Sequence, residues 1–321
     1  MIVDFQHHFT PPELMEARGS GGPVLLYDAS GAPRSTAGPL LCDLDEHICM
    51  MDAAGIGAAV LSSPAGMCAD LAPSRIVNDK ARDAERNYPG RFIGTAHVHP
   101  LGGPEAYREL ERCAHELGFP GVIITSEFNG LYVDAPEMEP FWGQAERLGL
   151  YVFIHPPLIH NFPQQYDAYD LGRSVGREIS LISATIRLIN SGVLDRHPSL
   201  VIQMSHLGGG IGAMMSRIRS YQDREFWGTA GHPRHGMKPE KDFDYYIRQR
   251  IVFDVAGFCG GITSVQAGLL EIPASHMVFG TDYPQEIRTR EDVRDYVSQI
   301  RKLGKDGQRI LSGNNGLLLK K

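Results

Sequence analysis

The sequence predicts an α/β fold in the form of a (β/α)8 barrel. Eight short apolar runs alternate with longer stretches of helical periodicity along 321 residues. Seven of these runs are continuously apolar, which is typical of parallel strands buried on both faces. A doubly wound open sheet is the alternative, but the first run is not followed by the GxGxxG fingerprint of its dinucleotide-binding form.

The expected strands and helices follow each other in order. The strands are IVDF at 2–5, AAVLSS at 58–63, FIGTAHV at 92–98, GVIITS at 121–126, YVFIH at 151–155, LVIQMSH at 200–206, IVFDVA at 251–256 and MVFGTD at 277–282. The helices are 45–55, 75–90, 105–118, 141–149 and 180–198, and the first three end at glycine, a common helix stop.

Two segments, 19–39 and 224–244, interrupt this alternation, and we expect them to be loop insertions that serve as lids or partner surfaces. No internal repeat or linker is visible, so we expect residues 1–321 to form one domain.

Composition excludes several classes of partner. Basic residues number 31 and acidic residues 38, which argues against nucleic acid or an anionic membrane as the main partner. No apolar run approaches the ~18 residues of a membrane span, and the start of the chain does not resemble a signal peptide. The five cysteines include no CxxC pair, which favours reduced thiols that pack in a cytoplasmic protein.

Polar side chains stand at the carboxyl ends of four expected strands. They are Gln6 and His8 on the first strand, His155 on the fifth, His206 at the end of the sixth and Asp282 on the eighth. Because active sites of (β/α)8 barrels lie at this end, we expect these residues to meet at one rim. Residues two apart in a strand point to the same side, so Gln6 and His8 share a face while His7 points away.

This set of side chains suits a catalytic metal. Imidazole nitrogens and a carboxylate oxygen bind Zn²⁺, Mn²⁺, Fe²⁺ or Co²⁺, and a catalytic site leaves one position open for water or substrate. A histidine beyond those needed for ligation can act as an acid or base near neutral pH. Each residue alone could equally be structural, and only their shared position favours a site.

The other histidines fit structural roles: His97 and His99 could line the pocket, whereas His47, His115, His197, His232, His235 and His276 are expected on helix or loop surfaces.

The order of motifs resembles the decarboxylase and hydrolase branch of the amidohydrolase superfamily, which includes aminocarboxymuconate-semialdehyde decarboxylase and the γ-resorcylate decarboxylases. The motifs are DFQHHFTPPE, MDAAGIGAAVLSSP, YPGRFIGTAHVHP, GFPGVIITSEFNG, AERLGLYVFIHPP, RLINSGVLDRHPSLVIQMSHLGGG, MVFGTDYP and ILSGNNGLLL. This resemblance implies a barrel of the metal-dependent hydrolase type with one divalent cation, for which we expect Zn²⁺, with Mn²⁺ as the alternative.

The resemblance also assigns roles. His8, His155 and Asp282 match the family's metal ligands, and Asp282 and His206 match its proton carrier and catalytic histidine. Gln6 stands where the family has the first residue of HxH or ExH. A neutral amide oxygen is a weaker donor than imidazole or carboxylate, so we expect Gln6 to lower the metal affinity.

Further residues are candidates for binding the substrate. The resemblance implies that Arg217 binds a substrate carboxylate across the interface of a homodimer. Glu127 and Asn129, which follow the fourth strand, could bind substrate hydroxyls. Phe258, just past the seventh strand, could stack on a planar substrate.

The reaction that these expectations favour is non-oxidative loss of CO₂ from a small aromatic or unsaturated carboxylic acid. In one alternative the same residues activate water, and the enzyme is a hydrolase or hydratase of a lactone, C–C or C=C substrate. In another, Gln6 marks a degenerate barrel that binds a small carboxylate without turnover. The aspartate in GTDYP leans toward the decarboxylases.

Overall fold

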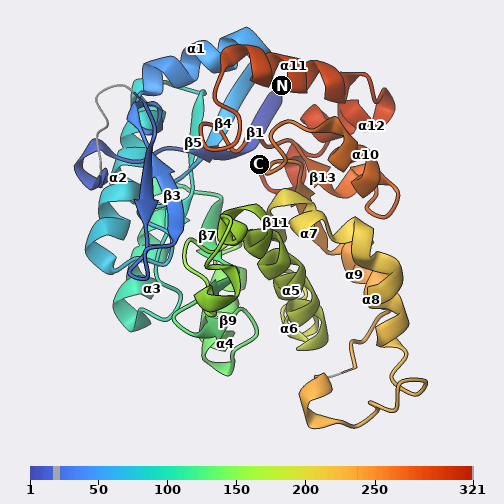
Figure 1. Cartoon of the computed structure of the whole chain (residues 1–321). Helices are drawn as coiled ribbons and strands as arrows, with labels where there is room; N and C mark the ends of the chain where they lie inside the picture. The colour runs from blue at the N-terminus through green and yellow to red at the C-terminus, as the bar shows by residue number, and fades with distance from the viewer. Residues whose placement is uncertain (17–21, 237, 320–321) are drawn as a thin grey trace.

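The computed structural model describes residues 1–16, 22–236 and 238–319, which contain a closed parallel barrel (Figure 1). Its strands pair in chain order: β1 (Ile2–His8), β4 (Ile56–Ser62), β5 (Phe92–Gly94) with β6 (Ala96–His97), β7 (Gly121–Thr125), β10 (Tyr151–His155), β11 (Ile202–Met204), β12 (Ile251–Asp254) and β13 (Met277–Val278). The chain beyond β13 closes the ring, because Phe5 N donates to Phe279 O at 2.9 Å and His8 N to Tyr283 O at 2.7 Å. The predicted barrel is confirmed, with its third strand broken at Thr95.

Helices surround the barrel on the outside (Figure 1). They are α1 (Leu44–Ala54), α2 (Leu71–Asn87), α3 (Gly103–Arg112), α4 (Glu139–Arg147), α5 (Arg177–Asn190), α6 (Val193–Arg196), α7 (His206–Gly210), α8 (Met215–Gln222), α9 (Phe243–Gln249), α10 (Ile262–Leu269), α11 (Arg290–Arg301) and α12 (Lys305–Gln308). The helix expected over 180–198 is two helices, because Gly192 adopts a φ of 75° between them.

The barrel interior is filled by alternate strand residues, and a bulge changes which residues of β1 enter it. Phe5 packs inside with Phe153 and Val252. The register between β1 and β4 shifts between Asp4 and His7, so the next residue, Gln6, also faces inward. Such a bulge re-aims side chains at a strand end.

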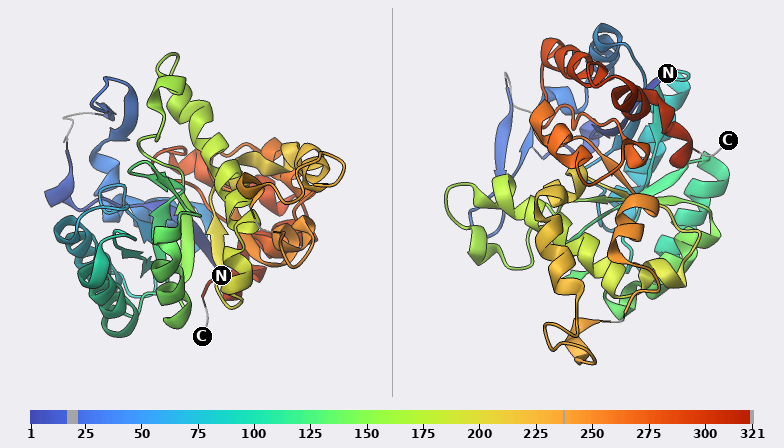
Figure 2. Two further views of the ribbon diagram at one scale, coloured as in Figure 1. Left: turned by 90° about the horizontal axis from the view of Figure 1, so that it is seen from below. Right: turned by 90° about the vertical axis from the view of Figure 1, so that its right-hand side faces the viewer.

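Both expected insertions are present, although residues 19–21 and 237 lie outside the described residues. Residues 22–39 contain the hairpin of β2 (Val24–Tyr27) and β3 (Pro33–Ala37), which lies at the end of the barrel away from the N terminus (Figure 2). Thr36 Oγ1 donates to Gln285 at 2.6 Å and ties this hairpin to the end of the eighth strand. Residues 224–236 and 238–242 project from the barrel beyond α8 (Figure 1).

Some expectations about single residues are wrong. His47 and His197 are buried, not on the surface, while Cys49 and Cys259 are exposed and do not pack in the core. Across the described part of the chain, every helix is too short or too polar to cross a membrane.

Candidate active site

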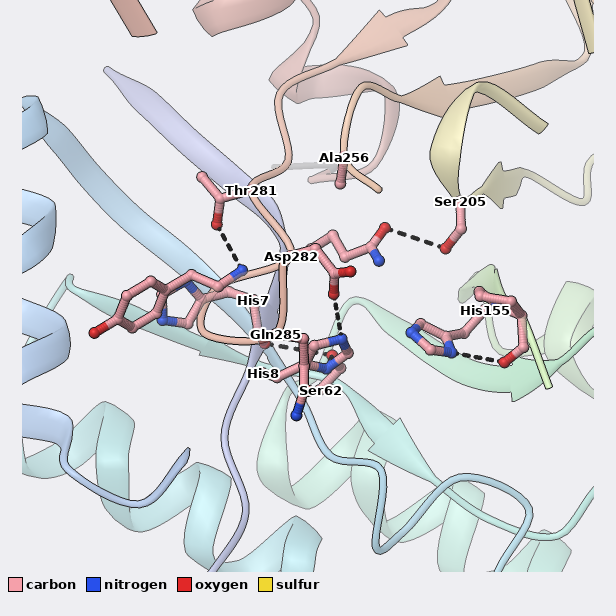
Figure 3. A network of polar contacts seen from close by, with 12 residues as sticks. His7, His8, Ser62, His155, Ser205, Ala256, Thr281, Asp282 and Gln285 are labelled. Carbon is pink, nitrogen blue, oxygen red and sulfur yellow. Dashed lines mark hydrogen bonds and ion pairs between the residues drawn. The ribbon is translucent and has the colours of Figure 1, made fainter. Parts of the chain in front are cut away.

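His8, His155 and Asp282 converge at the carboxyl ends of their strands (Figure 3). One ligand atom from each lies within 4.8 Å of the others, and all three side chains are buried. The predicted meeting of these residues from the first, fifth and eighth strands is therefore what the structure shows.

The hydrogen bonds of the two histidines leave the same ring nitrogen available. Nδ1 of His155 donates to Pro156 O at 2.8 Å. Ser62 Oγ donates to His7 O at 3.3 Å and therefore accepts from Nδ1 of His8 at 2.9 Å. With both Nδ1 atoms acting as donors, the lone pairs of both Nε2 atoms are available to a cation.

The donor set fits a divalent metal. Oδ1 of Asp282 lies 2.6 Å from Nε2 of His8, and this buried oxygen has no hydrogen-bond partner that satisfies normal geometry among the described residues. So short a contact needs a positive charge between the two atoms: a proton when His8 is an imidazolium, or a metal ion when the ring is neutral. Two imidazoles and one carboxylate are the usual three protein ligands of a catalytic metal.

The protonation states of the clustered residues are consistent with binding of a divalent metal. Burial alone raises the pKa of Asp282, but His8 and His206 outweigh burial and hold it below its usual value, so the carboxylate is ionised. Burial, with His8 nearby, lowers the pKa of His155 well below its usual value, so its ring is neutral. A neutral imidazole and an ionised carboxylate are the forms that bind a metal.

His206 flanks the cluster at the start of α7. Its Nε2 lies 3.6 Å from Oδ2 of Asp282, its Nδ1 lies 2.9 Å from Oε1 of Glu178, and its backbone N–H donates to Asp254 Oδ1 at 3.0 Å. Burial lowers the pKa of His206, but Glu178 and Asp282 outweigh burial and hold it well above its usual value. His206 is thus a candidate proton carrier next to the three candidate ligands.

The backbone is strained at both His206 and Asp282. His206 has a φ of 53° and Asp282 a φ of 56°, in the left-handed region that residues other than glycine rarely adopt. Such strain concentrates at functional sites.

Gln6 lies beside His206 instead of joining the histidine and aspartate cluster. Its Oε1 accepts from Ser205 Oγ at 3.1 Å, and its Nε2 lies 2.9 Å from Nε2 of His206. A neutral His206 with its proton on Nδ1 accepts from this amide. The imidazolium would instead require the amide to turn and present its oxygen. The expected role of Gln6 as a metal ligand stays a prediction.

His7 points away from the cluster, as expected, into a buried network behind it. Nδ1 of His7 lies 3.0 Å from Asp4 Oδ2, and its Nε2 lies 3.0 Å from Nδ1 of His47. Asp4 also accepts from Thr281 N at 3.0 Å. Burial and His7 lower the pKa of His47 to about 3, so this ring is a neutral structural group. The network joins β1 to α1 and to the end of the eighth strand.

A cavity of about 610 Å³ is lined by Thr10, two residues past His8, and by Thr125, which pairs with His155, but not by the cluster residues themselves. Glu127 and Asn129 line it as well. The Glu127 carboxylate is 3.0 Å from Nδ1 of His160, and Asn129 Nδ2 is 3.2 Å from Nε2 of His99. Both predicted residues therefore face a space large enough for a small aromatic acid.

The other two predicted substrate residues differ in position. The ring of Phe258 lies 6.4 Å from that of His206, next to the cluster. Arg217 is exposed on α8, with its guanidinium 5.1 Å from the Tyr221 ring centre, and it does not join the cluster of its own chain.

Sequence reasoning missed Asp254 and Glu178. Asp254 ends the seventh strand, so the rule that found the other strand-end residues could have found it. Burial raises its pKa to about 6. Glu178 stands in the first turn of α5, and no strand-end signal points to it.

Comparison with known proteins agrees with this geometry. A family model described as amidohydrolase matches residues 3–303. The chain is 30% identical over 303 residues to a γ-resorcylate decarboxylase of Rhizobium radiobacter, covering 88% of each chain. It superposes on the crystal structure of 2,6-dihydroxybenzoate decarboxylase from Rhizobium with a TM-score of 0.80 and 26% identity, covering 99% of this chain and 98% of that one.

A third comparison is with a dihydroxybenzoic acid decarboxylase from Polaromonas, solved with manganese and the inhibitor 2-nitroresorcinol. The TM-score is 0.79 at 24% identity, and the match covers 99% of this chain and 96% of that one.

Proposed function

The chain belongs to the amidohydrolase family, and on that premise we propose that it removes CO₂, without oxidation, from a small aromatic or unsaturated carboxylic acid by using one divalent metal ion. The observation that carries this proposal is the convergence of His8, His155 and Asp282 beside His206. Its relatives include decarboxylases named for γ-resorcylate, for 2,6-dihydroxybenzoate and for 2-amino-3-carboxymuconate-6-semialdehyde.

His8, His155 and Asp282 would hold the metal. When bound, a divalent cation supplies Lewis acidity, which orients the substrate carboxylate and a neighbouring oxygen and withdraws charge from the ring. The donor set accepts Zn²⁺ or Mn²⁺. Zinc is our expectation from the sequence, and manganese is the metal in the Polaromonas structure, so both belong in any assay.

Breaking the C–CO₂ bond requires a proton on the ring carbon. His206 and Asp282 are the two candidates for supplying it, and the charges favour His206 because its pKa is held high while Asp282 is held ionised. As the proton adds to the carbon, the C–CO₂ bond breaks, its electrons restore the ring and CO₂ leaves. His206 then regains a proton from water.

The remaining residues would shape the substrate site. Phe258 lies where its ring can contact a planar substrate next to His206. Glu127 and Asn129, which line the cavity, would accept hydrogen bonds from ring hydroxyls or donate hydrogen bonds to them. Their present partners, His160 and His99, hold them in position.

We further propose that the protein is a cytoplasmic homodimer in which Arg217 reaches the site of the second copy. The support is that Arg217 is exposed on α8 beside Tyr221, Phe226 and Trp227, which are also exposed. Light scattering gives the oligomeric state. Arg217→Ala should raise the KM for the acid if this residue binds its carboxylate.

The test of the reaction is a screen of hydroxybenzoates with protein loaded separately with Zn²⁺ and Mn²⁺, in which CO₂ release is followed beside ultraviolet absorbance. Decarboxylation gives equal amounts of CO₂ and phenol, and His206→Ala abolishes both. Consumption of a substrate without CO₂ would indicate hydrolysis or hydration. Binding of acids without any turnover would indicate the degenerate barrel.

A further inference from the structure

Glu178 contacts His206 from an element that contributes nothing else to the metal cluster. Its Oε1 lies 2.9 Å from Nδ1 of His206, and it comes from the first turn of α5. The histidine side chain is 4% exposed and the glutamate side chain 18%. This contact is therefore a largely buried, charge-assisted hydrogen bond, which is stronger than one between neutral groups.

The glycine run after His206 permits this contact. Gly209 has a φ of 73°, and a Cβ atom built on it would lie 2.0 Å from the backbone oxygen of Glu178. Any other residue at 209 would push α5 away from α7. The spacing of the two elements, which brings Glu178 to His206, thus depends on a glycine at this position.

Among the described residues, His206 is the hydrogen-bond partner of the Glu178 carboxylate. Its Oε2 is buried and has no hydrogen-bond partner among them. An ionised group held in this way loses hydration, and its contact with His206 is what compensates for that loss.

The opposite edge of the same ring faces the reacting groups. Nε2 of His206 lies 2.9 Å from the Gln6 amide nitrogen and 3.6 Å from Asp282 Oδ2. When Nδ1 donates to Glu178, Nε2 is the nitrogen that exchanges a proton with the site. The same assignment holds for the neutral ring and for the imidazolium.

We propose that Glu178 is the positioning residue that fixes the ring orientation and tautomer of His206, so that Nε2 faces the substrate. Its effect on turnover rests on the proposed function, whereas its effect on the histidine ring does not. Loss of an outer partner of this kind typically costs 10–100-fold in activity.

The kinetic test compares Glu178→Gln, Glu178→Asp and the matched control Glu137→Gln, an exposed residue outside the site. We expect Glu178→Gln to lower kcat by about 10–100-fold, with KM changed by less than about threefold and full metal content. Glu178→Asp should recover part of kcat, because it keeps the charge. An unchanged kcat in Glu178→Gln, or a loss that follows metal content, would overturn the proposal.

A second test does not need a substrate. In ¹⁵N-histidine-labelled protein, the His206 signals, identified with His206→Asn, should show a protonated Nδ1 with a slowly exchanging proton in the wild type. That proton should exchange fast in Glu178→Gln. An unprotonated Nδ1 in the wild type, or an unchanged exchange rate of this proton in Glu178→Gln, would overturn the proposed role of Glu178 but not the proposed function. Absence of CO₂ release from the wild type overturns the proposed function and leaves this result standing.

Discussion

Nε2 of His8 lies 2.6 Å from Oδ1 of Asp282, although the two residues stand near opposite ends of the chain. The contact exists because the eighth strand closes the barrel against the first, where Asp282 N donates to Gln6 O at 2.9 Å. Closure of the barrel is therefore what brings the proposed metal ligands His8 and Asp282 together.

The first prediction concerns the charge of Asp282. Replacing Asp282 by Asn removes the one carboxylate among the three proposed metal ligands while keeping the shape of the side chain. We expect metal affinity to fall at least about tenfold and CO₂ release to fall by about 100-fold or more. Metal analysis and CO₂ assays of the purified variant measure both. The control is Asp306→Asn, an exposed position on α12. Full metal content and activity in Asp282→Asn would contradict the assignment.

The second prediction is that removal of metal inactivates and destabilises the protein. Dialysis against a chelator should abolish CO₂ release, and added Mn²⁺ or Zn²⁺ should restore it. A metal that binds only the folded state stabilises it by about 2.7 kcal/mol at 100 times its Kd. Thermal unfolding with and without metal should therefore differ by several degrees. A chelated protein with unchanged activity and unfolding temperature would exclude a metal enzyme.

The third prediction addresses Gln6. If its side chain is a metal ligand, Gln6→Glu should raise metal affinity at least about tenfold, since a charged oxygen replaces a neutral one, and Gln6→His should raise it less. Isothermal titration of metal-free protein measures these affinities. Unchanged metal binding in both variants would show that Gln6 serves only Ser205 and His206, the groups that it contacts here.

The sequence predicts some parts of the fold and of the candidate site better than others. Continuous apolar runs identified β10 at the residues where the structure has it and β7 to within one residue, because strands buried on both faces leave that pattern. The same strand-end rule found His8, His155 and Asp282. The single-domain organisation of the chain stays a prediction.

Contacts that helices make with the site could not be predicted from the apolar pattern of the strands. Glu178 begins a helix, and its approach to His206 depends on the packing of α5 against Gly209, which no local periodicity records. His47 looked like a surface residue in its helix, yet it faces His7, because a histidine that pairs with another polar group can be buried.

The fourth prediction uses glycine positions to displace His206 without changing any polar group. Gly257 has a φ of 84°, and a Cβ atom on it would lie 2.1 Å from the His206 ring. We expect Gly257→Ala to lower kcat at least about tenfold while metal content stays unchanged.

The matched control for this variant is Gly260→Ala in the same loop. Gly260 also has a positive φ, of 73°, but a Cβ atom there would meet its neighbours only at 3.4 Å or more. Both alanines share the backbone strain of about 1 kcal/mol, so the difference between them in CO₂ release isolates the contact with His206. Equal activity in the two variants would show that the position of His206 is not critical.

The fifth prediction is that stability falls in mild acid because of His97. This ring is buried, its Nδ1 donates to Thr95 O at 2.8 Å, and its Nε2 accepts from Ser63 N at 2.8 Å. Burial lowers its pKa from 6.5 to about 3. Between these values the unfolded chain binds a proton that the folded protein does not, so the free energy of unfolding falls as the pH falls. The contribution is about 1.4 kcal/mol per pH unit, or about 2 kcal/mol between pH 6.5 and 5.

Urea unfolding at pH 7, 6 and 5 measures this effect in the wild type and in His97→Gln. The variant should be less stable at pH 7, because the imidazole packing is lost. Its free energy of unfolding should nevertheless fall less steeply with acid, because unfolding takes up about one proton fewer. His115→Gln is the control, since His115 is exposed in the folded protein. The slope, and not the stability itself, carries the conclusion: if His97→Gln kept the wild-type slope, His97 would have to take up its proton within the folded barrel, and its two hydrogen bonds could not both persist.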